Sequence, residues 1–169
     1  MSIGVKRNQY GGGGGGVGKR YIVKDGVLQE DFALFGGRSS NGYANISYSI
    51  SGNTASFSIG YQAWLYSSVF VNEMVDVTDA TKIHIEGEFH VSSGTIRTAA
   101  NRACASKTNP QTSSWTQLDG VDVSSWNQPF VRELDVSNET GLVYIALING
   151  SECQASASGY IRIDNLWIE

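Results

Sequence analysis

Two histidines and two glutamates alternate along one short segment of the sequence. His84, Glu86, Glu88 and His90 stand two residues apart, and apolar residues fill most of the positions between them. Alternate residues of a β-strand share one face and lie ~6.5–7 Å apart, so these four side chains diverge too far to reach a single zinc ion. We interpret them as the solvent face of a half-buried strand.

Aromatic residues are the strongest binding candidates. Tyr61, Trp64 and Tyr66 crowd one segment, and Trp115 borders a polar loop. Exposed aromatic rings can stack on the apolar faces of sugars, while neighbouring Asn, Gln and Asp side chains bond the hydroxyls. We predict that these four residues bind a glycan; the alternative is that they fill the core.

The sequence offers little for catalysis. No carboxylate pair stands out for glycoside hydrolysis, and no Gly-x-Ser-x-Gly elbow occurs. Cys104 has no evident base partner. The glycine run is not a phosphate loop, because Gly18-Lys19 is followed by Arg20 rather than by Ser or Thr. We expect no catalytic residues and a protein that is not an enzyme.

Composition narrows the partners. The net charge of −4 lacks the basic stripe that a nucleic-acid surface needs. No apolar run approaches the ~20 residues of a membrane span, and Met1 to Gly16 lack the apolar stretch of a signal peptide. We therefore expect neither nucleic acid nor membrane as a partner, and a protein made in the cytoplasm.

The N-terminal segment differs from the rest of the chain. Six consecutive glycines, Gly11 to Gly16, follow an arm that contains Lys6, Arg7 and Tyr10. Such a run has no preferred conformation, and a basic arm on an acidic protein often docks on a partner, the alternative being a solvated tail. The expected division is an anchoring arm at 1–10, a glycine-rich neck at 11–19 and a folded domain at 20–169.

Local patterns predict strands throughout the domain. Asp25-Gly26 between two apolar runs, and Ser51-Gly52-Asn53 between two alternating runs, are typical of hairpin turns. Lys82–Val91 shows the clearest alternation, and Thr95–Ala105 is expected to pair back on it. Further strands are expected at Leu65–Val71, Phe130–Val136, Leu142–Ile148 and Tyr160–Ile168.

These strands indicate an all-β fold. Eight or more short strands with turns between them, and no segment of helical period, favour a single antiparallel jelly-roll-like sandwich. Trp126 and Trp167 lie inside apolar strand patterns, so we expect them in its core. Cys104 and Cys153 could pair, although two cysteines and no signal peptide favour reduced thiols.

The C-terminal third resembles the ending of jelly-roll carbohydrate-binding modules and related adhesins. The likeness lies in Ser125-Trp126-Asn127-Gln128-Pro129-Phe130, in Val143-Tyr144-Ile145-Ala146-Leu147 and in the closing Ile163-Asp164-Asn165. It implies glycan binding. In that family an acidic residue of the last strand often helps to bind a structural calcium ion, which here would be held by Asp164 with Glu30 or Asp31. The alternative for Asp164 is a turn cap.

The segment Tyr21-Ile22-Val23-Lys24-Asp25-Gly26-Val27-Leu28-Gln29 resembles the opening of short fibre and tail-associated phage proteins. It implies a virion structural or accessory protein, a head fibre, decoration or tail-tip component, made in the bacterial host cytoplasm. Its arm would bind other virion proteins, and its sandwich would face outward, as a homo-oligomer. The alternative is an extracellular, free carbohydrate-binding module of a glycan-degrading system.

Overall fold

The chain folds as an antiparallel β-sandwich in a computed structural model that describes residues 18–29, 32–36, 46–60, 62–71, 73–99, 101–108, 117–122, 126–153 and 156–169. Within these ranges every regular element is a strand, which confirms the predicted all-β class. The strands are β1 Arg20–Lys24, β2 Val27–Leu28, β3 Leu34–Gly36, β4 Ile46–Ser51, β5 Thr54–Ile59, β6 Gln62–Val71, β7 Val75–Asp76, β8 Lys82–Ser93, β9 Ile96–Ala99, β10 Arg102–Ser106, β11 Gln117–Asp122, β12 Gln128–Asp135, β13 Leu142–Cys153 and β14 Ala157–Ile168.

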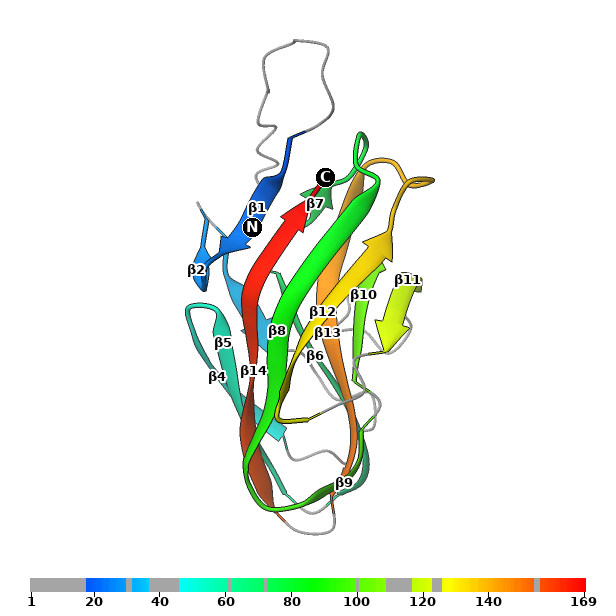
Figure 1. Ribbon diagram of the computed structural model, residues 1–169. Helices are drawn as coiled ribbons and strands as arrows, with labels where there is room; N and C mark the ends of the chain where they lie inside the picture. Colours follow the sequence, from blue (N-terminus) through cyan, green and yellow to red (C-terminus); the bar gives the residue numbers. More distant parts are fainter. Residues whose placement is uncertain are drawn as a thin grey trace, which may run out of the picture.

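Two sheets form the layers (Figure 1). Sheet A runs β12-β8-β14-β1-β2, and β5 with β4 continues it beside the first half of β14. Sheet B runs β11-β10-β13-β6-β3, with β7 and β9 also paired to β13. The long strands β8, β13 and β14 therefore provide the frame on which the shorter strands are placed.

The core lies between the sheets, and period-2 alternation builds it. From sheet A, Ile83, Ile85 and Phe89 of β8 are fully buried, as are Ile161 and Leu166 of β14. Sheet B contributes a facing set that includes Val69, Val71, Ala103, Ala105 and Leu147. Because alternate residues point to opposite faces, the residues that alternate with these core positions lie on the outer face of sheet A.

The predicted hairpins are confirmed. Asp25 and Gly26 have φ values of 50° and 76° between β1 and β2, the left-handed region that a two-residue turn requires. Gly52 has φ 54° between β4 and β5. In Figure 1 the two hairpins lie one above the other on the same side of β14, with their turns facing each other.

One predicted pairing is wrong. Thr95–Ala105 does not return to β8; β9 and β10 pair with β13 in the opposite sheet. Gly94, with φ 81°, turns the chain out of sheet A immediately before β9. The alternation of this segment is equally compatible with either sheet, because period 2 defines a buried face and not a partner.

A β-bulge interrupts β14 where Asp164 has no register partner on β8: Ile163 pairs with Gly87 and Asn165 with Glu86. The two hairpin turns satisfy its backbone. The Gly26 amide donates to the Asp164 carbonyl at 2.8 Å, and the Asn53 side-chain amide donates to the Ile163 carbonyl at 2.8 Å. The bulge thus fills the gap between β1 and β5 along the edge of β14.

Cys104 carries a reduced thiol, buried on the outer side of sheet B. Its register partner is Ala146, whereas Cys153 lies seven residues farther along β13, ~23 Å away at the rise of a strand. A disulfide needs Cα atoms within ~7 Å, so the two cysteines cannot pair. Burial raises the pKa of the Cys104 thiol to about 12, which makes it unreactive in the folded protein.

Candidate functional site

The outer face of sheet A carries two distinct groups of side chains. The aromatic row consists of Tyr21, Trp167 and His84, which are in register across β1, β14 and β8. The polar face lies farther along β8 and β14 and consists of Glu86, Glu88, His90, Tyr160, Arg162, Asp164 and Asn165. The bulge at Asp164 separates the two groups.

As predicted, His84, Glu86, Glu88 and His90 lie on the outer face of the half-buried strand β8, but this face is more covered than expected. The four residues do share one face, but His84 is only 7% exposed, and Glu86, Glu88 and His90 are half-buried. The reason is that β14 and β12 flank β8 on both sides, and their outward side chains cover it. Among the described residues no group of His, Cys, Asp and Glu is arranged to hold a metal ion.

The rings of the aromatic row pack against one another. The rings of His84 and Trp167 stack with centroids 4.5 Å apart and planes 2° from parallel. Tyr21 leans on Trp167 at 5.8 Å. Trp167 is buried as expected, but in this row on the outer face and not in the sandwich interior. Trp126 does contact the interior, edge-on to Phe57 and Phe89 at 5.8 Å each.

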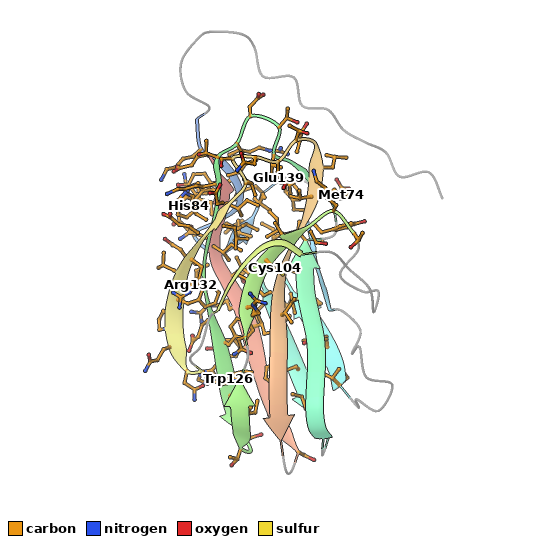
Figure 2. All side chains as sticks on the ribbon, turned by 90° about the vertical axis from the view of Figure 1, so that its right-hand side faces the viewer. Met74, His84, Cys104, Trp126, Arg132 and Glu139 are labelled. Carbon is orange, nitrogen blue, oxygen red and sulfur yellow. The ribbon has the colours of Figure 1, made fainter. Side chains whose placement is uncertain are left out.

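Carboxylates fix the position of His84 within the row. Its Nε2 lies 3.0 Å from Glu169 Oε1, and its Nδ1 lies 3.3 Å from Glu133 Oε1. Glu133 also accepts from Lys82 at 2.6 Å. Figure 2 shows His84 among the crowded side chains toward one end of the sandwich, with Trp126 well away from it. The row therefore joins the last residue of the chain to β8 and β12.

The polar face is organised around Glu88. One carboxylate oxygen of Glu88 lies 3.2 Å from His90 Nδ1. The other accepts from the Tyr160 hydroxyl at 3.2 Å and from Arg162 at 3.3 Å. The rings of His90 and Tyr160 stack at 4.6 Å. Burial, and then the hydrogen bond to Glu88, raises the pKa of Tyr160, so the phenol stays a donor over the whole neutral range.

Asp164 holds the guanidinium of Arg162 with two hydrogen bonds, 2.6 Å from Nε and 3.2 Å from Nη2. This fork geometry fixes the orientation of the guanidinium and raises the pKa of Arg162. The Arg162 side chain is 35% exposed, and its Cζ lies 5.7 Å from the ring centroid of Tyr160. In the structure Asp164 thus binds Arg162, and calcium binding by Asp164 remains a prediction.

Asn165 connects the turn between β1 and β2 to the polar face. Its Nδ2 donates to Glu86 Oε2 at 2.7 Å, and its Oδ1 accepts from the Asp25 amide at 2.9 Å. The second carboxylate oxygen of Glu86 has no partner within the described ranges. On the other side of Glu86, Val131 of β12 is in register with it and 61% exposed. A free acceptor and an exposed apolar group therefore stand side by side.

Serine hydroxyls extend the surface beyond Tyr160. Ser49 of β4 and Ser56 of β5 are in register with Tyr160 and His90. Next to this row, Ser93 and Ser158 share a hydrogen bond of 2.7 Å. These small side chains project little above the sheet and add hydroxyl groups to the surface beside Tyr160.

Most of the predicted site residues lie outside the described part. These are the arm residues Lys6, Arg7 and Tyr10, the calcium candidates Glu30 and Asp31, and the aromatic residues Tyr61 and Trp115. Trp64 and Tyr66 are alternate residues of β6, and Tyr66 is in register with Gly150 of β13, but their side chains are not described. Their roles in glycan binding and attachment stay predictions.

Sequence reasoning missed Tyr160 and Arg162. Both were treated only as members of an apolar C-terminal strand, although the spacing Tyr160, Arg162 and Asp164 places a ring, a cation and a carboxylate on one face. That alternation was the available signal. The contact of Arg162 with Glu88 depends on the register between β8 and β14, which no local sequence pattern contains.

Comparisons with known proteins agree on the fold. No protein-family model matches the sequence, and no curated protein matches it. Among solved structures, a carbohydrate-binding module of the β-sandwich superfamily matches with TM-score 0.54 and 12% identity over 92% of this chain. This chain spans 64% of that chain. A variant of the family 29 carbohydrate-binding module CBM29-2 matches with TM-score 0.48 and 12% identity over 90% of this chain and 92% of that one.

The neighbours are thus β-sandwich carbohydrate-binding modules, and at this identity the first of them shows the fold alone. A membrane-spanning helix is not found in the described residues.

Proposed function

We propose that this chain is a non-catalytic glycan-binding domain whose ligand lies along the polar face. The observation that carries the proposal is the Arg162–Glu88–Tyr160 network, which is half-buried and held in place by hydrogen bonds and an ion pair, with part of the guanidinium exposed. Recognition of this kind combines a few convergent polar groups with adjacent apolar surface, which Val131 supplies.

The chemistry of the network suits sugar hydroxyls. A hydroxyl both donates and accepts, and the polar face offers the partly exposed guanidinium of Arg162 as a donor and the carboxylate of Glu86 as an acceptor. Because Asp164 already orients the guanidinium, little side-chain entropy is lost when a ligand binds. Each hydrogen bond to a charged group is worth about 1.5–3 kcal/mol in a partly dehydrated site.

A glycan array with the purified protein tests the proposal. Arg162→Ala should lower affinity for the selected glycan at least about 10-fold, the value of one charge-assisted hydrogen bond. Arg132→Ala is the matched control, since Arg132 lies on β12, where its register partner on β8 is Ile85 and not a residue of this network. Failure to bind any glycan, or equal loss in both variants, would argue against the proposed function.

Attachment through the arm is a second proposal, and it rests on the layout of the sequence. In the sequence the arm and the glycine run precede β1, which begins at Arg20. As a virion fibre or decoration component, the protein would use residues 1–10 to join other virion proteins and would present the polar face outward. Deletion of residues 1–16 should leave a folded domain that no longer enters the assembly; retained incorporation would contradict this role.

A further inference from the structure

The chain places one of its own ammonium groups on the aromatic row. Lys19 Nζ lies 4.6 Å from the ring centroid of Trp167 and 3.9 Å from Glu169 Oε2. Because His84 stacks on one face of the indole at 4.5 Å, Lys19 must occupy the opposite face. The side chain of Lys19 is 52% exposed, whereas Trp167 beneath it is 9% exposed.

We propose that Trp167, Tyr21 and Glu169 form an ammonium-binding subsite that Lys19 fills in the free protein. The ligand group that displaces Lys19 is the primary amine of an amine-bearing sugar. This inference rests on the proposed glycan-binding function and adds a second subsite, on the aromatic row, to the one on the polar face.

The attraction of this row for cations is visible twice. Lys24 Nζ stands 5.4 Å from the ring centroid of Tyr21, the neighbouring ring of the row. An aromatic face attracts a cation through its quadrupole, and a nearby carboxylate adds to that attraction. An amine-bearing sugar matches both features, and it also offers an apolar C–H face to the indole that a lysine ammonium lacks.

The subsite is preformed without Lys19. Glu169 is held by Trp167 Nε1, which donates to Oε2 at 3.4 Å, and by His84 Nε2 at 3.0 Å from Oε1. Lys19 itself precedes the first residue of β1 and belongs to no strand. An exposed ion pair of this length contributes little, so a ligand can displace Lys19 at small cost.

Calorimetric titration of the full chain with two probes tests the subsite. The probes are a β-linked glucosamine oligomer with free amines and the same oligomer after N-acetylation. The free-amine oligomer should bind the wild type more tightly than the acetylated one. Lys19→Ala should raise affinity for the free-amine oligomer about five-fold, the scale of one exposed cation–π contact, because it removes the internal competitor.

Two variants complete the test. Lys24→Ala removes an equal charge from the adjacent ring and should leave the affinity within about two-fold, because the cation–π contact of Lys24 is with Tyr21 and not with Trp167. Glu169→Gln should abolish the preference for the free amine. Equal binding of both oligomers, no binding of the free-amine oligomer, or an unchanged affinity in Lys19→Ala would overturn the subsite. Retained binding of the glycan selected on the array would show that the proposed function survives that result.

Discussion

The aromatic row and the polar face share the strands β8 and β14 but use them differently. In the row, each ring covers the next, so Trp167 and His84 are 9% and 7% exposed. In the polar face, Tyr160 and Arg162 are half-buried and hydrogen-bonded, yet the Arg162 side chain stays 35% exposed. The row is thus held together by ring packing and would admit a ligand only where Lys19 leaves Trp167, whereas the polar face presents oriented, partly exposed side chains in the free protein.

The largest expected difference between the two regions is in stability. Trp167→Ala removes a buried ring that contacts Tyr21 and His84, and should lower the free energy of unfolding by about 3 kcal/mol. Tyr160→Ala should cost less than about 1.5 kcal/mol, because its ring is half-buried and makes one stacked pair, yet it should weaken glycan binding. Urea titrations of both variants make the comparison; equal losses of stability would break it.

Gly87 allows the close approach of β8 and β14, the two strands that carry both the aromatic row and the polar face. A Cβ at Gly87 would lie 2.1 Å from the Arg162 carbonyl oxygen, so Gly87→Ala must push β8 and β14 apart beside the bulge. We expect a loss of about 1–3 kcal/mol in unfolding free energy, together with weaker glycan binding. Gly18→Ala is the control, since nothing lies within 4 Å of its added Cβ. Thermal unfolding should separate the two variants clearly.

The bulge itself can be loosened from the side of the hairpins. Asn165→Ala removes the hydrogen bonds to Glu86 and to the Asp25 amide, and should cost about 1 kcal/mol. Hydrogen exchange should then rise at Asp25 and Gly26, while the aromatic row keeps its protection. Faster exchange in β8 at His84 would show that the two regions are one cooperative unit.

In acid, carboxyl groups at the end of the aromatic row should lose their contribution to the stability of the fold. The hydrogen bond from Lys82 lowers the pKa of Glu133, and the one from Ser137 lowers the pKa of Asp135. Although burial opposes it, the pKa of Glu169 is also lowered, by hydrogen bonds from Trp167 and His84. A carboxyl with a depressed folded pKa stabilises the fold above its unfolded pKa and loses that contribution as pH falls through the folded value.

Stability should therefore decline as the pH drops below about 4.5, the ordinary value for Glu133 and Glu169. Glu133→Gln should make that decline shallower, because the variant has one depressed carboxyl fewer to protonate. Urea midpoints measured from pH 3 to 7 provide the comparison. An acid profile identical to that of the wild type would remove Glu133 from the account.

The sequence predicts correctly those features that residues close together in the chain determine. Asp25-Gly26 specifies its turn by backbone preference alone, and the alternation of Lys82–Val91 specifies which side chains share a face. The pairing of Thr95–Ala105 was predicted wrongly, and the Arg162–Glu88 contact was not predicted, because both depend on which strands become neighbours. The bulge at Asp164 escaped prediction for the same reason: turns distant in sequence satisfy its backbone.

The most direct test of the central claim is residue-resolved. Backbone amide chemical shifts should be followed by NMR while the protein is titrated with the glycan that the array selects. We predict that the largest shifts fall on β8 from Glu86 to His90 and on β14 from Tyr160 to Asn165, and that Arg162→Ala removes them. Shifts confined to β6 and β13 would place the ligand on sheet B and contradict the assignment of the polar face.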